Sequence, residues 1–185
     1  MNILEISDQY KKTADGFLNE SKLISVLENY GRVEFEGSYA GNVMFSGDVD
    51  IRVVRETDFS MDEIFNIMKD IYTTCEAEFR SFYLKTDWDD PRIGEQFPNG
   101  HYLGFKTFLN NEKWKLDVWF VSEQENSRDR GVLDISDFDL TAEQRNTILE
   151  FKKYRKETGR KISGQEIYEA VLEKGITKPE QLVIQ

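Results

Sequence analysis

Alternation of apolar and polar residues marks two short strands that carry acidic side chains. Residues 48–53 read Asp-Val-Asp-Ile-Arg-Val, and residues 114–120 read Trp-Lys-Leu-Asp-Val-Trp-Phe. Successive side chains of a strand point to opposite faces. The apolar set of each stretch therefore shares one face, and Asp48, Asp50 and Asp117 lie on the other. The apolar faces predict packing against helices, which leaves three carboxylates on the polar faces of two strands.

Apolar residues at helical spacing predict four helical regions. Residues 8–30 carry a helical stripe, either as one helix or as two helices divided at Gly16. The clearest amphipathic pattern runs over residues 61–82, where apolar positions recur at steps of three and four. Towards the C-terminus, helices are expected over residues 141–157 and 164–173.

Short alternating stretches between these helices predict a mixed sheet. Residues 32–36 form an expected strand before Gly37, and residues 102–109 and 114–121 form an expected antiparallel hairpin. Residues 85–100 are a turn-rich connection, which is either a functional loop or a surface excursion. The fold class that follows is α+β, a mixed sheet flanked by helices. We expect a domain of residues 1–125 and a helical C-terminal appendage of residues 126–185.

Composition limits the partners and the compartment. The chain has 185 residues, is 39% hydrophobic and carries a net charge of −11, which argues against a long nucleic acid as partner. The single cysteine, Cys75, excludes an internal disulfide, suits a reducing compartment and lies on a helical apolar stripe, as a packed thiol would. Neither a signal peptide nor a run of about 18 apolar residues is present, so no membrane association and a cytoplasmic location are expected.

The three acids, together with Gly37 and Ser38, suggest a metal-dependent phosphate site. Hard cations such as Mg²⁺ need oxygen ligands, and two carboxylates two residues apart on a strand can bridge a pair of them. Two ions about 3.5–4 Å apart neutralise the attacking and leaving oxygens of a phosphoryl transfer. Glycine lets the backbone approach phosphates, and the Ser38 hydroxyl can donate hydrogen bonds to them.

These residues resemble the motif of the polymerase-beta-like nucleotidyltransferase superfamily. Its pattern is Gly-Gly or Gly-Ser, about nine to thirteen residues, Asp-hydrophobic-Asp or Glu, and a later acid on a strand. This chain has Gly37-Ser38, nine residues, Asp48-Val49-Asp50, and Asp117. The spacing is similar to small bacterial nucleotidyltransferases, which often read Gly-Ser-x-Ala-Arg-Gly before Ser-Asp-x-Asp, whereas here Gly41 replaces the arginine and Gly47 is inserted.

The resemblance implies a nucleotidyltransferase fold over residues 16–121 and a role for each motif residue. Asp48 and Asp50 would bind both Mg²⁺ ions, while Asp117 would bind the catalytic ion and assist deprotonation of the attacking hydroxyl. Gly37 and Ser38 would hold the triphosphate. The implied enzyme moves an NMP group, with ATP the expected donor, onto a hydroxyl of a small molecule or a protein.

Several alternatives stay open at this level. The chain could be a catalytically silent nucleotide-binding or antitoxin-like interaction module of the same fold, or a mixed-sheet domain whose acids merely face solvent. His101, the single histidine, either starts a strand or lines a cleft. A basic cluster is either a solvated helix face or a positive wall for a triphosphate or an acidic partner, and it comprises Lys152, Lys153, Arg155, Lys156, Arg160 and Lys161.

Overall fold

The computed structural model describes residues 1–86, 97–128 and 131–182, and it confirms the α+β fold class. Within these residues, five strands form one mixed sheet in the order β1-β2-β5-β4-β3. The strands are β1 (Arg32–Glu36), β2 (Asp48–Arg55), β3 (Arg80–Thr86), β4 (Gly100–Leu109) and β5 (Glu112–Ser122). β2 and β5 run parallel, and every other neighbouring pair is antiparallel, including the predicted β4–β5 hairpin.

Helices precede, interrupt and follow the sheet. Before and between the strands lie α1 (Ile3–Glu20), α2 (Leu23–Glu28), α3 (Gly37–Ala40) and α4 (Met61–Thr74). After β5 come α5 (Glu123–Asn126), a 3₁₀ turn (Ile135–Asp137), α6 (Ala142–Thr158), α7 (Gly164–Tyr168) with a π-helical continuation (Glu169–Glu173), and a last 3₁₀ turn (Pro179–Gln181).

One face of the sheet packs against α1, α2 and α4. The core contains Ala14 and Leu18 of α1, Leu27 of α2, Ile64 and Ile71 of α4, and the apolar faces of the strands. The apolar residues that alternate with the acids, such as Val49 and Leu116, are almost fully buried there. The predicted division of each strand into an apolar and a polar face is therefore correct.

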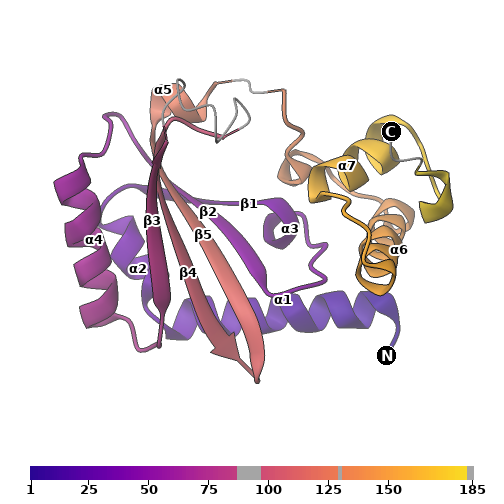
Figure 1. The fold of residues 1–185 in the computed structure, drawn as a ribbon, viewed down its shortest axis with the longest axis horizontal. Coiled ribbons are helices and arrows are strands. Elements are labelled where there is room, and N and C mark those ends of the chain that lie inside the picture. Colours follow the sequence, from indigo (N-terminus) through magenta and orange to yellow (C-terminus); the bar gives the residue numbers. More distant parts are fainter. Residues whose placement is uncertain (87–96, 129–130, 183–185) are drawn as a thin grey trace.

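The C-terminal helices form a second core at the other end of the molecule. Figure 1 shows α4 and α6 on opposite sides of the sheet, with α1 running between them. The second cluster joins Ile148 and Phe151 of α6 and Ile167 of α7 with Val43 and Phe45, which precede β2. The C-terminal helices thus pack onto the segment that leads into the acid-bearing strand. The division after residue 125 stays a prediction.

The predicted helix over residues 61–82 is wrong in its second half. α4 ends at Thr74, Cys75 already has an extended backbone, and residues 80–86 form the edge strand β3. Phe79 packs edge-on against Phe17 and Phe105 instead of extending the helix. Aromatic residues at 79, 82 and 83 satisfy both a helical and a strand spacing, and pairing with β4 decides for the strand.

The first helical region also differs from its prediction. α1 begins at Ile3 rather than at residue 8, because Asn2 and Glu5 form a capping box. The break falls at Lys22, which adopts a left-handed φ of 63°, and not at Gly16. α6 and α7, by contrast, begin within one residue of where the sequence predicts.

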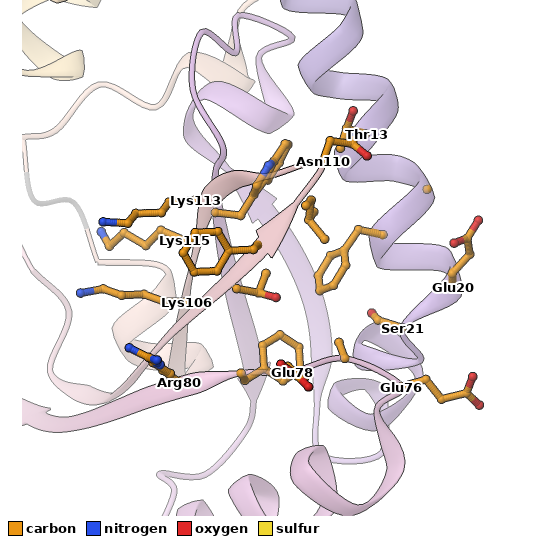
Figure 2. A pocket seen from close by; sticks show the side chains of 18 of the residues that line it. Thr13, Glu20, Ser21, Glu76, Glu78, Arg80, Lys106, Asn110, Lys113 and Lys115 are labelled. Atoms are coloured by element: carbon orange, nitrogen blue, oxygen red, sulfur yellow. The ribbon is translucent and has the colours of Figure 1, made fainter.

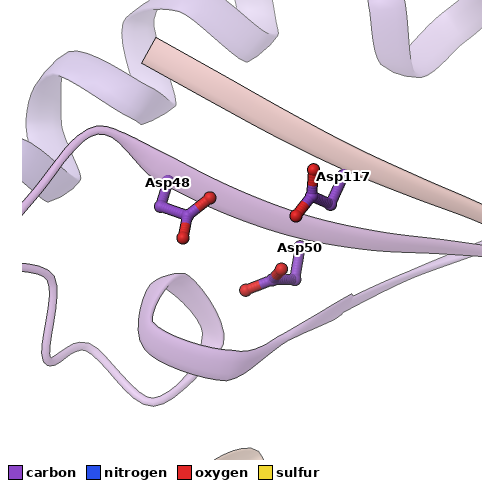
Figure 3. Close-up of side chains that lie close together, drawn as sticks. All are labelled: Asp48, Asp50 and Asp117. Atoms are coloured by element: carbon purple, nitrogen blue, oxygen red, sulfur yellow. The ribbon is translucent and has the colours of Figure 1, made fainter. Parts of the chain in front are cut away.

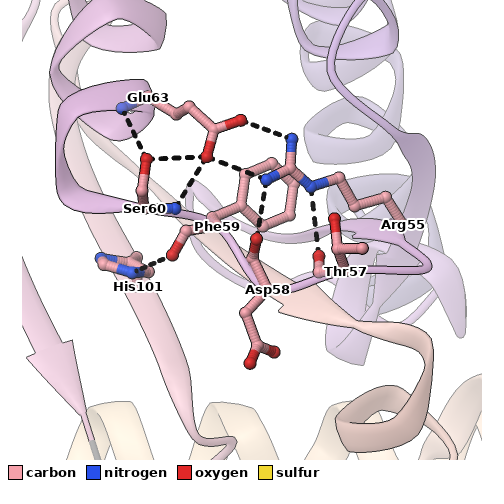
Figure 4. Close-up of polar contacts among 7 residues, drawn as sticks. All are labelled: Arg55, Thr57, Asp58, Phe59, Ser60, Glu63 and His101. Carbon is pink, nitrogen blue, oxygen red and sulfur yellow. Dashed lines mark hydrogen bonds and ion pairs between the residues drawn. The ribbon is translucent and has the colours of Figure 1, made fainter.

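His101 is a structural residue rather than part of a cleft. Its side chain is buried at the start of β4, where it contacts the Tyr83 hydroxyl and the carbonyl of Phe59. Phe59 belongs to the loop between β2 and α4, and this loop also holds the N-terminus of α4. There the Glu63 carboxylate accepts hydrogen bonds from the Arg55 side chain and from the Ser60 backbone N–H (Figure 4). Burial lowers the pKa of His101, which keeps the ring neutral.

Two further predictions, on the connection over residues 85–100 and on membrane spans, are tested only for the described part of the chain. Of the connection over residues 85–100, residues 87–96 lie outside the described part of the chain. Among the helices that the structure does describe, none combines the length and the apolar character needed to cross a bilayer.

Candidate active site

The parallel pairing of β2 with β5 brings the three predicted acids together. Asp50 lies directly opposite Asp117, and Asp48 lies opposite Lys115. One carboxylate oxygen from each of Asp48, Asp50 and Asp117 lies within 4.8 Å of the other two (Figure 3). Carboxylates two residues apart on one strand and a third on the neighbouring strand therefore share one small volume.

Gly37 lies against this cluster. It has a left-handed φ of 59°, and a Cβ added there would come within 2.6 Å of Oδ2 of Asp50. Both the backbone conformation and the lack of space require glycine at this position. Ser38 follows in the short helix α3, so the Gly37-Ser38 pair of the motif lies beside the second acid of the triad.

Asp117 is held by two side chains that sequence reasoning did not assign to the site. The Tyr102 hydroxyl donates to Oδ1 of Asp117, and the Lys115 ammonium donates to Oδ2. Burial, and then the hydrogen bond to Asp117, raise the pKa of Tyr102, so the phenol stays a neutral donor. Burial opposes the charge of Lys115, but Asp117 and the other two acids raise its pKa overall. Alternation along the predicted strand already places Lys115 on the face of Asp117, whereas Tyr102 follows only from the pairing of β4 with β5.

Asp48 and Asp50 are poorly compensated as charged groups. Within the described chain, Oδ1 of Asp48 is buried and has no hydrogen-bond partner. Burial raises the pKa of Asp48, and burial together with Asp48 and Asp117 raises the pKa of Asp50 to about 7. Closely spaced oxygens, an orphaned buried carboxylate oxygen and like-charge repulsion together fit a site for hard divalent cations.

The members of the basic cluster differ in burial, and the two roles that the sequence left open stay predictions. Lys152 of α6 is only 4% exposed and donates to the carbonyl of Val43 and the hydroxyl of Tyr168, at 2.8 and 3.0 Å. Burial, with Arg155 nearby, lowers the pKa of Lys152 to about 7. Lys152 and Arg155 also act electrostatically on Asp48. Lys153, Lys156, Arg160 and Lys161 are partly or fully exposed.

A cavity of about 1460 Å³ lies beside the triad rather than over it. It is bounded by α1, the α4–β3 connection and the end of the β4–β5 hairpin. Figure 2 shows Lys113, Lys115, Lys106 and Arg80 directed to one side of the hairpin, away from α1. Lys115 borders both this cavity and Asp117, so the cavity opens next to the site without containing the acids.

Comparison with known proteins gives matches in solved structures alone. No protein family model and no curated protein matches this sequence. Two structures of the Cid1 poly(U) polymerase, one with Mg and 3′-dATP bound and one described for RNA terminal uridylyl transferase activity, share 16% and 14% identity at TM-scores of 0.49 and 0.48. A cytoplasmic RNA terminal U-transferase shares 12% identity at a TM-score of 0.47.

These matches are partial. Each covers 80% of this chain, but this chain spans only 40–42% of the matched chains. At 12–16% identity, the function of this chain has to follow from its own side chains.

We expect Gly37→Ala to damage the site more than it damages the fold. The left-handed backbone costs alanine about 1–2 kcal/mol. The added methyl group also displaces the Asp50 carboxylate, which should weaken Mn²⁺ binding by about 10–100-fold, as loss of a group that orients a metal ligand does. Urea unfolding and a Mn²⁺ titration measure the two effects.

Gly159→Ala is the matched control for this substitution. Gly159 has a φ of 67° and nothing within 4 Å of an added Cβ, so it carries the same backbone strain without the collision. Equal Mn²⁺ affinities in the two variants would show that Gly37 does not support the site.

Stabilisation by a divalent cation should increase with pH. The pKa of Asp50 in the folded protein is about 7, above its ordinary value of 3.8. Without metal, the stability linked to this group is therefore complete below pH 3.8 and is lost as the pH rises through 7. Metal binding needs the ionised carboxylate, so Mg²⁺ should raise the unfolding temperature more at about pH 8 than at about pH 6.

Asp50→Asn serves as the control for the pH dependence. The amide cannot ionise, so this variant should be more stable than wild type without metal at about pH 8, and Mg²⁺ should stabilise it little. A wild-type Mg²⁺ effect of the same size at both pH values would contradict the assignment.

Proposed function

We propose that this chain is a metal-dependent nucleotidyltransferase that moves an NMP group, AMP from ATP, onto a hydroxyl of a small molecule or a protein. The observation that supports it is the convergence of Asp48, Asp50 and Asp117 on one sheet face beside Gly37 and Ser38. Three acids from two strands next to a glycine turn combine the two requirements of the reaction, a cation site and a place for phosphates.

The acids divide the work according to their position. Asp48 and Asp50, on one strand, would contact both Mg²⁺ ions, and Asp117, on the neighbouring strand, would contact one of them. Bound Mg²⁺ would neutralise charge on the attacking and leaving oxygens. Asp117 would also accept the proton of the acceptor hydroxyl as that oxygen bonds to the α-phosphorus and pyrophosphate leaves.

The triphosphate has candidate partners on two sides of the acids. Gly37 allows the backbone to approach it, and the Ser38 hydroxyl would donate to a phosphate oxygen. From α6, the positive charges of Lys152 and Arg155 reach Asp48. A triphosphate on this side of the site would therefore lie in the field of Arg155, whereas the buried Lys152 ammonium stays bonded to Val43 and Tyr168 and acts only at longer range.

Pyrophosphate release from ATP with Mg²⁺ tests this proposal. Asp48→Asn and Asp117→Asn should each lower the rate by about 100-fold or more, since each removes charge stabilisation from the transition state. Asp139→Asn, at an exposed position, is the control and should react as wild type does. Rates that stay equal in all four proteins, or no release by any of them, would favour the silent interaction module instead.

One surface favours a second candidate function, nucleotide addition to the end of a single-stranded nucleic acid. Lys115, Lys106 and Arg80 lie opposite one another across β5, β4 and β3, in a row that begins beside Asp48. We call these three residues the cation row. Phe82 is 46% exposed next to it, and Lys106 lies 5.7 Å from the Phe82 ring. Interleaved cations and aromatic rings are typical of surfaces that bind phosphates and stack bases.

Extension of an oligonucleotide distinguishes the two candidate functions. If the second holds, the protein should extend a labelled single-stranded oligonucleotide, and Lys106→Glu with Arg80→Glu should raise KM by about tenfold or more, because each reversal removes a phosphate contact. Lys12→Glu is the control, since Lys12 lines the same cavity from α1. Nucleotide transfer to small molecules or protein without any extension would retain the first candidate.

A further inference from the structure

We propose that the Lys115 ammonium is the built-in counterion of the acid triad, and that it competes with the divalent cation for Asp117 and thereby sets the metal affinity of the site. This inference rests on the proposed function, because it assumes that the triad binds metal. It assigns Lys115 a positioning role, distinct from the ligand roles of the acids.

Strand geometry places Lys115 among the acids. It precedes Asp117 by two residues, so both side chains project from the same face of β5. In the parallel register it lies opposite Asp48, while Asp117 lies opposite Asp50. The four side chains therefore occupy adjacent positions, three acids and one cation.

Lys115 makes the direct ionic contact of this group. Within the described chain, it is the cation that hydrogen-bonds to a triad carboxylate, through Oδ2 of Asp117. Lys152 and Arg155 act on Asp48 only at longer range, and the Lys152 ammonium is already bonded to Val43 and Tyr168. Without metal, compensation of the clustered negative charge therefore depends first on Lys115.

The same contact obstructs metal binding. Tyr102 occupies Oδ1 of Asp117 and Lys115 occupies Oδ2, so a cation that approaches Asp117 meets an ammonium group at one oxygen. Lys106 lies directly opposite Lys115 on the neighbouring strand β4, and the repulsion between the two ammonium groups favours the orientation of Lys115 towards the acids. The Lys115 side chain is 43% exposed and sits on a flexible stem, so it can leave Asp117 for solvent when a stronger cation arrives.

The test compares Mn²⁺ affinity in the absence of nucleotide, with thermal unfolding of the metal-free protein as the second readout. Lys115→Met should bind Mn²⁺ at least about tenfold more tightly than wild type, because a nearby positive charge is lost. The same variant should unfold at a lower temperature without metal, and saturating Mn²⁺ should close or reverse that gap. Lys115→Arg should restore the wild-type pattern in part.

Lys113→Met is the matched control. Lys113 lies on the same strand and the same face, two residues further from Asp117, and is exposed. Its affinity for Mn²⁺ should stay close to that of wild type.

Two outcomes would overturn the proposal, and they can be told apart. If wild type binds Mn²⁺ and Lys115→Met binds it equally or more weakly, Lys115 does not compete with the metal, and the proposed function is unaffected. If wild type and Asp117→Asn both fail to bind Mn²⁺, the metal site itself is absent, and the proposed function fails together with this inference.

Discussion

The parallel pairing of β2 with β5 is the constraint on which the site depends. A shift of one residue in either strand would move its carboxylates to the opposite face of the sheet. The register is held by side chains such as Val49 and Leu116, which are buried beneath the acids against α1, α2 and α4. The hydrophobic core therefore holds Asp48, Asp50 and Asp117 together against their mutual repulsion.

Alternation along each strand was enough to predict which side chains share a face, and the Gly37-Ser38 motif predicted which turn lies near the acids. Alternation within a strand says nothing about its neighbours. Strand order and register place Lys115 opposite Asp48 and Tyr102 against Asp117, so these two contacts could not be assigned from sequence, although alternation alone puts Lys115 on the face of Asp117. The edge strand β3 was missed for a related reason, since its aromatic residues fit a helical stripe until pairing with β4 is known.

Net charge proved a poor guide to the surface around the site. The chain carries a charge of −11, yet the cation row crosses three strands next to the triad. Electrostatic interactions between exposed groups are screened over about 10 Å, so a ligand at the sheet face responds to the local row rather than to distant acids. The expectation drawn from composition concerns the molecule as a whole, stays a prediction, and gives no information about this face.

Gly47, the residue inserted relative to the motif, lies where the strands, α1 and the C-terminal helices position one another. A Cβ at Gly47 would lie 2.5 Å from the Trp114 ring, and the Lys115 N–H donates to the Gly47 carbonyl, so the inserted glycine joins the start of β2 closely to β5. The Trp114 ring in turn packs against Tyr10 of α1, with the two ring centroids 6.0 Å apart. Farther along the chain, Arg145 of α6 donates to the Asn42 carbonyl in the segment that leads into β2. The acid-bearing strand β2 is thus held by β5 on one side and by α6 on the other. Substitutions in α6 should therefore alter the positions of the triad carboxylates through this segment, in addition to their electrostatic effect on Asp48.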